Sequence, residues 1–303
     1  MMGSGGVGGF FGGRLAKAGH DVTFVARGAH LAAMREHGLT IENVAQGNLH
    51  LSAVRAIEDP AAIGPVDCVI LSVKLWDTEE ACRQIKPLIG PHTAVLSLQN
   101  GVIKDDILRR AFGDAAVMGG VCYVATHIAR PGVIEQTGAM QRIVIGEYDG
   151  RASARSTALH SALAASGVAA ELSTDVRRSI WEKYVFLVGL SATTTSMRRT
   201  LGPIRAHPQT RAFMHDVMRE VVAVGRSHGV ALPEDYADNR LAFGDTLPAD
   251  MTSSMHHDLE KGNRLEVAWL SGGVVKLGRE KGIPTPCNRA VCDILALQAD
   301  GKT

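Results

Sequence analysis

Glycines near the N-terminus form the most informative pattern in this sequence. Gly3, Gly5 and Gly8 have the spacing G-x-G-x-x-G, and Gly6 stands between them. A helical pattern over 10–18 follows directly. Such glycines permit a tight turn, close approach of the backbone to a pyrophosphate, and close packing of the helix. Because the amides of the first helical turn would face phosphate groups, we identify these four glycines as candidate dinucleotide-binding residues.

The charged residue that follows the next predicted strand indicates whether the cofactor is NAD or NADP. The apolar run 22–25 predicts a strand, and Arg27 follows it, about 19 residues after Gly8. Enzymes that bind NAD carry an acidic residue near this point for the ribose hydroxyls, whereas arginine suits a 2′-phosphate. The sequence therefore favours NADP as the cofactor. The alternative is that Arg27 is a solvated surface cation.

The first half of the chain alternates short β-branched runs with helical stretches, which is typical of a parallel sheet with crossover helices. Strands are predicted over 22–25, 68–73, 94–98, 117–118 and 167–172, with 142–146 at the far edge of the sheet. Helices are predicted over 10–18, 77–85 and 105–112. This pattern favours an α/β domain of the Rossmann type.

The second half of the chain has longer helical patterns separated by prolines, which end helices and fix the following turns. Helices are predicted over 156–165, 176–194, 210–228, 255–262 and 266–281. We therefore expect two domains: residues 1–174 form the dinucleotide-binding domain, and residues 175–303 form an all-α domain.

Composition excludes several classes of protein. The 32 Lys and Arg against 31 Asp and Glu give a net charge of +1, which offers little attraction to a nucleic-acid backbone. No apolar stretch approaches the roughly 20 residues of a membrane-spanning helix, and no secretory signal precedes the glycines, so we expect a cytoplasmic protein. The five cysteines form no C-x-x-C pair, and the adjacent His256 and His257 would point to different helix faces. We therefore expect no metal site.

Only Met1 and Met2 precede the glycine pattern, although such a pattern normally follows a complete strand. We therefore expect the natural chain to begin about four to six residues earlier, with an apolar strand.

Seven motifs spread over nearly the whole chain resemble those of the ketopantoate reductase family. They are GSGGVGGFFGGRLAKAGHDVTFVARG, SVKLWDTEEA, SLQNGV, PGVIEQTG, IWEKYVF, SSMHHDLEKGNRLEV and GIPTPCNRAV. The resemblance implies a Rossmann domain followed by a helical domain of the 6-phosphogluconate dehydrogenase type. It also implies NADPH as the cofactor, a small 2-oxo acid as the substrate, a role in pantothenate biosynthesis, and a homodimer.

The resemblance also assigns roles to individual residues. Lys183 matches the catalytic lysine, and Glu266 matches the glutamate that hydrogen-bonds the substrate hydroxyl. Ser254 matches the serine that holds the substrate carboxylate. Asn100 matches the asparagine beside the nicotinamide that helps to place the lysine. Lys74 matches a cofactor contact, although a solvated lysine at the end of a strand is the alternative.

The sequence departs from the family pattern at three positions that carry asparagine in ketopantoate reductases. These positions hold Leu187, Ser191 and Met251, and we retain Ser191 as a candidate substrate-binding residue. Loss of amide donors leaves a more apolar pocket wall. We therefore expect reduction of ketopantoate or a more apolar 2-oxo acid, with Lys183 as the general acid. The alternative is an NADP(H)-binding regulatory protein without turnover.

Overall fold

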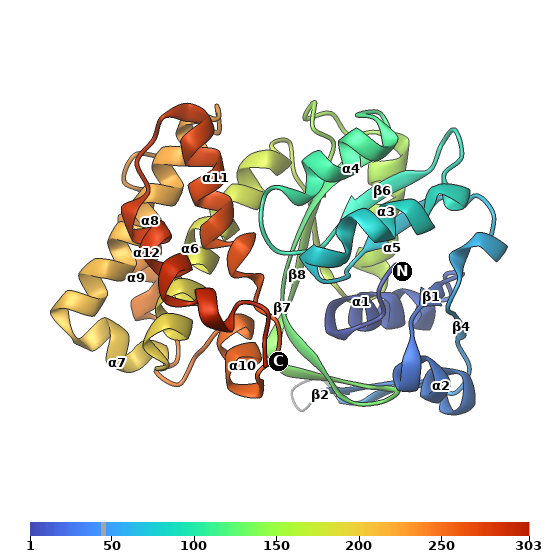
Figure 1. Cartoon of the computed structure of the whole chain (residues 1–303). Helices are drawn as coiled ribbons and strands as arrows, with labels where there is room; N and C mark the ends of the chain where they lie inside the picture. The colour runs from blue at the N-terminus through green and yellow to red at the C-terminus, as the bar shows by residue number, and fades with distance from the viewer. Residues whose placement is uncertain (44–46, 303) are drawn as a thin grey trace. The chain divides into compact units, whose positions relative to one another are not determined.

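The polypeptide divides into two units, which we describe separately. The computed structural model describes residues 1–43 and 47–302 (Figure 1). The sheet unit comprises Met1–Gln99 and Lys104–Val176, and the helical unit comprises Asn100–Ile103 and Arg177–Thr303. That residues 1–174 form the dinucleotide-binding domain and residues 175–303 a separate functional domain stays a prediction. Within the described ranges, no helix has the length and hydropathy that would allow it to cross a membrane.

Most pairs of neighbouring strands in the sheet unit are parallel. The strands are β1 (Thr23–Val25), β2 (Leu39–Asn43), β3 (Leu49–Leu51), β4 (Arg55–Ile57), β5 (Cys68–Leu71), β6 (Ala94–Ser97), β7 (Val117–Arg130), β8 (Val133–Gly146) and β9 (Ala169–Leu172). The main sheet has the order β3-β2-β8-β7-β6-β5, with β9 paired to β8, and a separate parallel pair is formed by β1 and β4. Strand β6 pairs in parallel with both β5 and β7, as expected for crossover connections.

Met1 and Met2 lie between β1 and β5. The amide of Met2 donates to Ile70 O and its carbonyl accepts from Ser72 N, both at 2.8 Å. On the other side, Val25 N donates to Met1 O at 2.9 Å. These two residues therefore join the β1–β4 pair to the main sheet immediately before the glycine turn.

The strands predicted at 22–25, 68–73, 94–98 and 167–172 are confirmed within two residues. The strand at 142–146 was wrongly predicted as an edge strand. It is the end of β8, which pairs with β7, β2 and β9. The prediction failed because these 14-residue strands are not buried throughout. The second half of β7 and the middle of β8 are largely exposed, so no continuous apolar run marks either strand.

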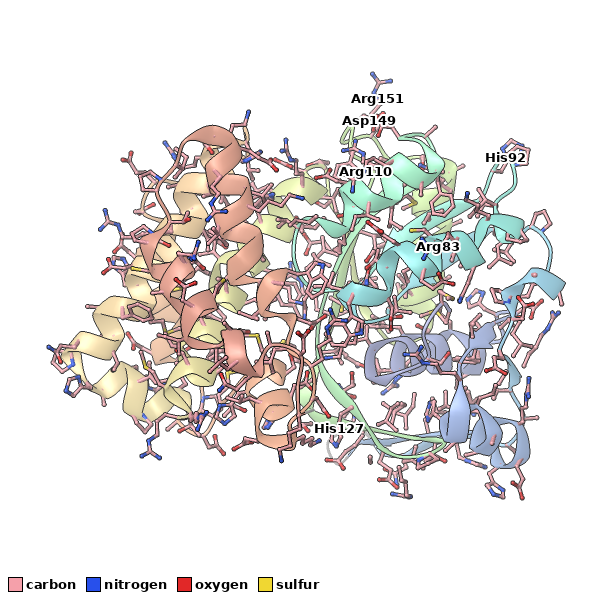
Figure 2. All side chains as sticks on the ribbon, in the orientation of Figure 1. Arg83, His92, Arg110, His127, Asp149 and Arg151 are labelled. Atoms are coloured by element: carbon pink, nitrogen blue, oxygen red, sulfur yellow. The ribbon has the colours of Figure 1, made fainter. Side chains whose placement is uncertain are left out.

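In its described residues the sheet unit has five α-helices: α1 (Gly6–Lys17), α2 (Gly28–His37), α3 (Thr78–Gln84), α4 (Lys104–Phe112) and α5 (Ala154–Ala165). Helix α1 packs through Phe10 and Phe11, whose side chains are fully buried together with Phe24 of β1. Burial of such a side chain contributes about 1.5–3 kcal/mol. The charged side chain of Arg151, in contrast, points outward (Figure 2), and Arg83 is also exposed.

The helical unit contains seven α-helices in the described ranges. They are α6 (Val176–Met197), α7 (Leu201–Ala206), α8 (Pro208–Ser227), α9 (Tyr236–Asp245), α10 (Ser254–Lys261), α11 (Ser271–Lys281) and α12 (Pro286–Ile294). The core of the unit includes Tyr184 and Val188 of α6 and Val217 and Val221 of α8, all at most 1% exposed. The structure thus has the predicted α/β domain followed by an all-α domain.

The continuous helix predicted over 266–281 is interrupted. A 3-10 turn, Glu266–Ala268, precedes α11, which begins only at Ser271. The hydroxyl of Tyr184 donates to Leu270 O at 2.6 Å and also lies 3.1 Å from Trp269 O. These carbonyls therefore bind a tyrosine of α6, and Leu270 leaves the helical conformation, with ψ −96°.

Candidate functional site

The four glycines form a turn that opens onto the N-terminus of α1. Gly3 has φ +86°, and a Cβ on Gly8 would lie 2.0 Å from Gly3 O, so both positions require glycine. Gly5 precedes the helix, and a Cβ there would meet nothing within 4 Å. No side chain caps the helix, so its first amides remain available. This open, uncapped turn fits a dinucleotide pyrophosphate.

His30 of α2 fixes the glycine turn, and the sequence analysis did not identify it. Its Nε2 lies 2.9 Å from Ser4 O, and its Nδ1 accepts a hydrogen bond from Gly132 N at 3.0 Å. Since Nδ1 is an acceptor, Nε2 carries the proton and donates it to Ser4. Burial lowers the pKa of His30, which favours this neutral ring.

Arg27 lies two residues after the end of β1 and is the N-cap of α2. Its side chain is 82% exposed, and its guanidinium lies 3.2 Å from an oxygen of Asp77. An exposed pair of this kind contributes little to stability, so Arg27 retains its ability to bind an anion.

Lys74 and Gln99 follow β5 and β6, respectively. The ammonium of Lys74 lies 5.6 Å from the centre of the Trp76 ring. The buried amide of Gln99, which the sequence analysis overlooked, donates to Val73 O at 3.0 Å and to the Thr78 hydroxyl at 2.8 Å. Gln99 therefore connects the carboxyl ends of these two strands, where ligands bind in open α/β sheets.

In the helical unit, Lys183 and Asn100 form a direct hydrogen bond. The ammonium of Lys183 donates to Asn100 Oδ1 at 2.8 Å, although 83 residues separate them in sequence. Lys183 is half-buried on α6, and Asn100 is also half-buried. The structure therefore brings together two residues that the sequence analysis selected from separate motifs.

Glu266 is buried. The sequence predicted it on an α-helix, but it lies on the 3-10 turn. The amides of Trp269 and Leu270 donate to its carbonyl oxygen, both at 3.0 Å. Tyr184 holds the same segment by its hydrogen bond to Leu270 O. Consecutive residues of α6, Lys183 and Tyr184, therefore hold Asn100 and the Glu266 turn.

Helix α6 carries a second polar residue, Ser191, on the same face as Lys183. A spacing of four residues places Lys183, Leu187 and Ser191 on one helix face. Ser191 is 1% exposed, and its hydroxyl has no hydrogen-bond partner among the described residues. A buried hydroxyl without a partner is costly unless a ligand satisfies it.

Ser254 is the exposed first residue of α10. The neighbouring Ser253, which the sequence analysis overlooked, caps this helix by accepting a hydrogen bond from His256 N at 3.1 Å. Its hydroxyl also lies 2.9 Å from the Thr194 hydroxyl. The position of Ser254 is therefore fixed relative to α6 through its neighbour.

In the described part of the chain, no group of three His, Cys, Asp or Glu side chains is placed to hold a metal ion. His256 has protein partners, with Nδ1 2.7 Å from Thr194 O and Nε2 3.2 Å from Glu260.

Comparisons with known proteins agree with this arrangement. The family model described as ketopantoate reductase PanE/ApbA matches residues 1–150, and its C-terminal counterpart matches residues 175–299. The chain belongs to the ketopantoate reductase family. Members of this family are oxidoreductases, and this chain has the Rossmann-type domain and helical domain of ketopantoate reductases.

Relatives of the ketopantoate reductase family align over almost the entire chain. The 2-dehydropantoate 2-reductase of Mesorhizobium japonicum is 32% identical, and the alignment covers 96% of this chain and 94% of the relative. A crystal structure of a ketopantoate reductase from Ralstonia eutropha is 35% identical, with a TM-score of 0.89 and coverage of 98% and 97%. The 2-dehydropantoate 2-reductase of Geobacter metallireducens is 28% identical, with a TM-score of 0.90 and coverage of 98% of both chains.

Proposed function

We propose that this protein reduces a small 2-oxo acid to the 2-hydroxy acid with NADPH, and that Lys183 is the general acid. The hydrogen bond between Lys183 and Asn100 is the observation that carries the proposal. An ammonium has three donors. One is directed to Asn100, which orients the group.

The chemistry requires one hydride and one proton. NADPH supplies the hydride when it is bound. As the carbonyl carbon is reduced, negative charge develops on its oxygen, and a nearby ammonium stabilises that charge. Lys183 Nζ then donates its proton to the oxygen, which yields the hydroxyl group. Glu266 hydrogen-bonds this hydroxyl, and the Tyr184 hydrogen bond holds the segment that carries Glu266.

We assign cofactor binding to residues 1–174 and substrate binding and catalysis to residues 175–303. Gly3, Gly5, Gly6 and Gly8 would hold the pyrophosphate, together with Lys74 and Asn100 as further cofactor contacts. Arg27 would bind the 2′-phosphate that distinguishes NADPH from NADH. A cytoplasmic location and a homodimer complete the assignment.

The substrate is ketopantoate or a 2-oxo acid with a more apolar side chain. Leu187 and Met251 are both half-buried and pack against the apolar core of the helical unit. Neither offers the amide that would bind a substrate hydroxyl. The buried hydroxyl of Ser191 and the exposed hydroxyl of Ser254 remain to bind the polar end of the acid.

A panel of 2-oxo acids tests this function. The absorbance of NADPH at the nicotinamide band should fall with at least one acid, and Lys183→Ala should abolish the reaction. Lys281→Ala, which removes an exposed lysine at the end of α11, is the matched control and should leave the rate unchanged. No turnover on the whole panel, or equal rates for both variants, would reject the enzymatic function.

An NADP(H)-binding regulatory protein is the second candidate function. It is favoured by the apolar residues Leu187 and Met251, because a substrate site that has lost its amides could have lost turnover. Tight binding of NADPH without oxidation by any acid on the panel would support this alternative.

A further inference from the structure

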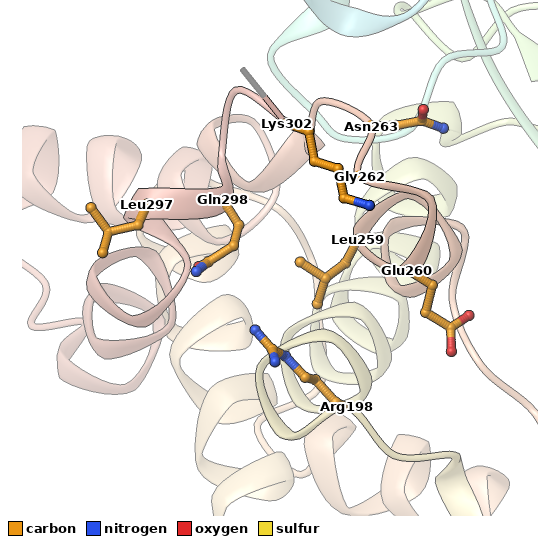
Figure 3. Close-up of a pocket in the computed structure, with 9 residues that line it drawn as sticks. Arg198, Leu259, Glu260, Gly262, Asn263, Leu297, Gln298 and Lys302 are labelled. Atoms are coloured by element: carbon orange, nitrogen blue, oxygen red, sulfur yellow. The ribbon is translucent and has the colours of Figure 1, made fainter.

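A cavity in the helical unit lies apart from all the site residues assigned above. Its volume is about 620 Å³, within the range of small-molecule sites of roughly 300–1,000 Å³. It is formed by the end of α6, the end of α10 and the segment 297–302 (Figure 3). Its principal lining residues are Arg198, Leu259, Glu260, Gln298 and Lys302.

Two cations line this cavity without a protein partner for their charge. Neither the guanidinium of Arg198 nor the ammonium of Lys302 makes a hydrogen bond or an ion pair with a residue in the described ranges. Figure 3 shows the Arg198 guanidinium and the Gln298 amide directed into the same space. Two cationic side chains and one amide therefore line the same cavity.

Glu260, the acidic lining residue, does not neutralise these cations. One of its carboxylate oxygens lies 3.2 Å from His256 Nε2, and the other lies 3.5 Å from His257 Nδ1. In Figure 3 the carboxylate is directed away from Arg198 and Lys302. The lining therefore carries two cations and one carboxylate, which is paired with histidine.

The backbone at Arg198 supports a role for its side chain. Its φ is +52°, and within the described ranges it is the one residue other than glycine with a positive φ. The amide of Arg199 donates to Thr194 O at 3.3 Å, as in the helix ends where glycine is usual. Arginine thus occupies a position where glycine would be less strained.

We propose that this cavity binds a small phosphate monoester. A phosphate group carries about −1.5 to −2 charge at neutral pH, which matches the two unpaired cations. The guanidinium of Arg198 can bind two phosphate oxygens, and Lys302 adds a point charge. Leu259 offers apolar surface to the carbon skeleton of the ester. This proposal does not depend on the reductase function.

Calorimetric titration with glycerol 3-phosphate tests the proposal, and it is performed on the protein with and without saturating NADPH. We expect one site per chain that remains when NADPH is bound. Arg198→Gly and Lys302→Gln should each weaken binding about 10-fold or more, as expected for loss of a charged hydrogen bond. The matched control Arg199→Gln removes an exposed arginine that does not line the cavity, and it should change the affinity less than twofold.

Thermal unfolding shows whether a variant that has lost binding is still folded. Because Arg198→Gly also relieves the positive φ, this variant should unfold at a temperature equal to or above that of the parent protein. Absence of saturable binding, equal losses in Arg198→Gly and Arg199→Gln, or tighter binding of succinate than of glycerol 3-phosphate would each overturn the proposal. Inorganic phosphate that binds as tightly as the ester would show that the cavity does not recognise the carbon skeleton, and this would also overturn the proposal.

Discussion

Arg27 and Asp77 form an exposed ion pair at 3.2 Å between two segments that each follow a parallel strand. If Arg27 binds the 2′-phosphate, Arg27→Ala should raise the Kd for NADPH about 10-fold and leave the Kd for NADH nearly unchanged. Fluorescence titration with both nucleotides measures this difference. Arg55→Ala, at an exposed arginine of β4, is the control. Equal losses for the two nucleotides would contradict the assignment of NADP.

Asp77→Asn should have the opposite effect. The carboxylate of Asp77 competes with the phosphate for Arg27, and its negative charge repels the phosphate. Its replacement by an amide should therefore strengthen NADPH binding a few-fold, since the affected pair is solvent-exposed. The gain should disappear in the double variant with Arg27→Ala, and a gain that persists would show that Asp77 acts independently of Arg27.

Asn100→Ala should reduce kcat about 10- to 100-fold, because Lys183 loses the acceptor that orients it. Asn100→Asp keeps an oxygen acceptor and adds a negative charge, which favours the protonated ammonium. The alkaline limb of its pH–rate profile should therefore move to higher pH. An unchanged profile in Asn100→Asp would separate Asn100 from the proton transfer.

The His30 ring makes the glycine turn sensitive to acid. Its pKa is lowered in the folded protein by burial, whereas in the unfolded chain it has its ordinary value near 6.5. As the pH falls below 6.5, the unfolded state takes up the proton first, so the free energy of unfolding decreases until the folded-state pKa is reached. Below that pKa, an added proton on Nδ1 would face the Gly132 amide. Urea unfolding between pH 5 and 8 measures this slope, and it should be smaller in His30→Gln.

Lys104 should be essential for the stability of the sheet unit. Its ammonium is buried and donates to Ser97 O, Gly120 O and the carboxylate of Asp105 at 2.9–3.1 Å. Lys104→Met leaves Asp105 buried without its cation, which should destabilise the protein by about 3–5 kcal/mol. Lys104→Met combined with Asp105→Asn should recover part of the loss in denaturant unfolding. A loss below about 1 kcal/mol in the single variant would contradict this account.

Local sequence patterns predicted those elements whose hydrophobic period persists along the element. The helix predicted over 210–228 is an example, since the side chains that α8 buries are apolar and recur at helical spacing. The hairpin β7–β8 could not be predicted in full, because the second half of β7 and the middle of β8 are exposed and the register of the pair shifts between Val124 and Thr126. The break before α11 depends on the hydroxyl of Tyr184, more than 80 residues away.

The candidate site shows the same limit. Lys183 and Asn100 were identified from the motifs that contain them, but their hydrogen bond is a tertiary contact. Ser253, Gln99 and His30 were missed because a capping serine, a buried amide and a neutral histidine have no distinctive spacing. Their roles follow from partners far away in the sequence.

Residues 100–103 separate from the strand that precedes them and cluster with the helical unit. A chimera in which residues 175–303 are exchanged for those of a relative would therefore place one parent's lysine opposite the other parent's asparagine. A single crossover near residue 175 therefore tests whether the lysine of one parent can form the hydrogen bond with the asparagine of the other. In evolutionary terms, the two halves of the gene are expected to co-vary at the SLQNGV and IWEKYVF segments.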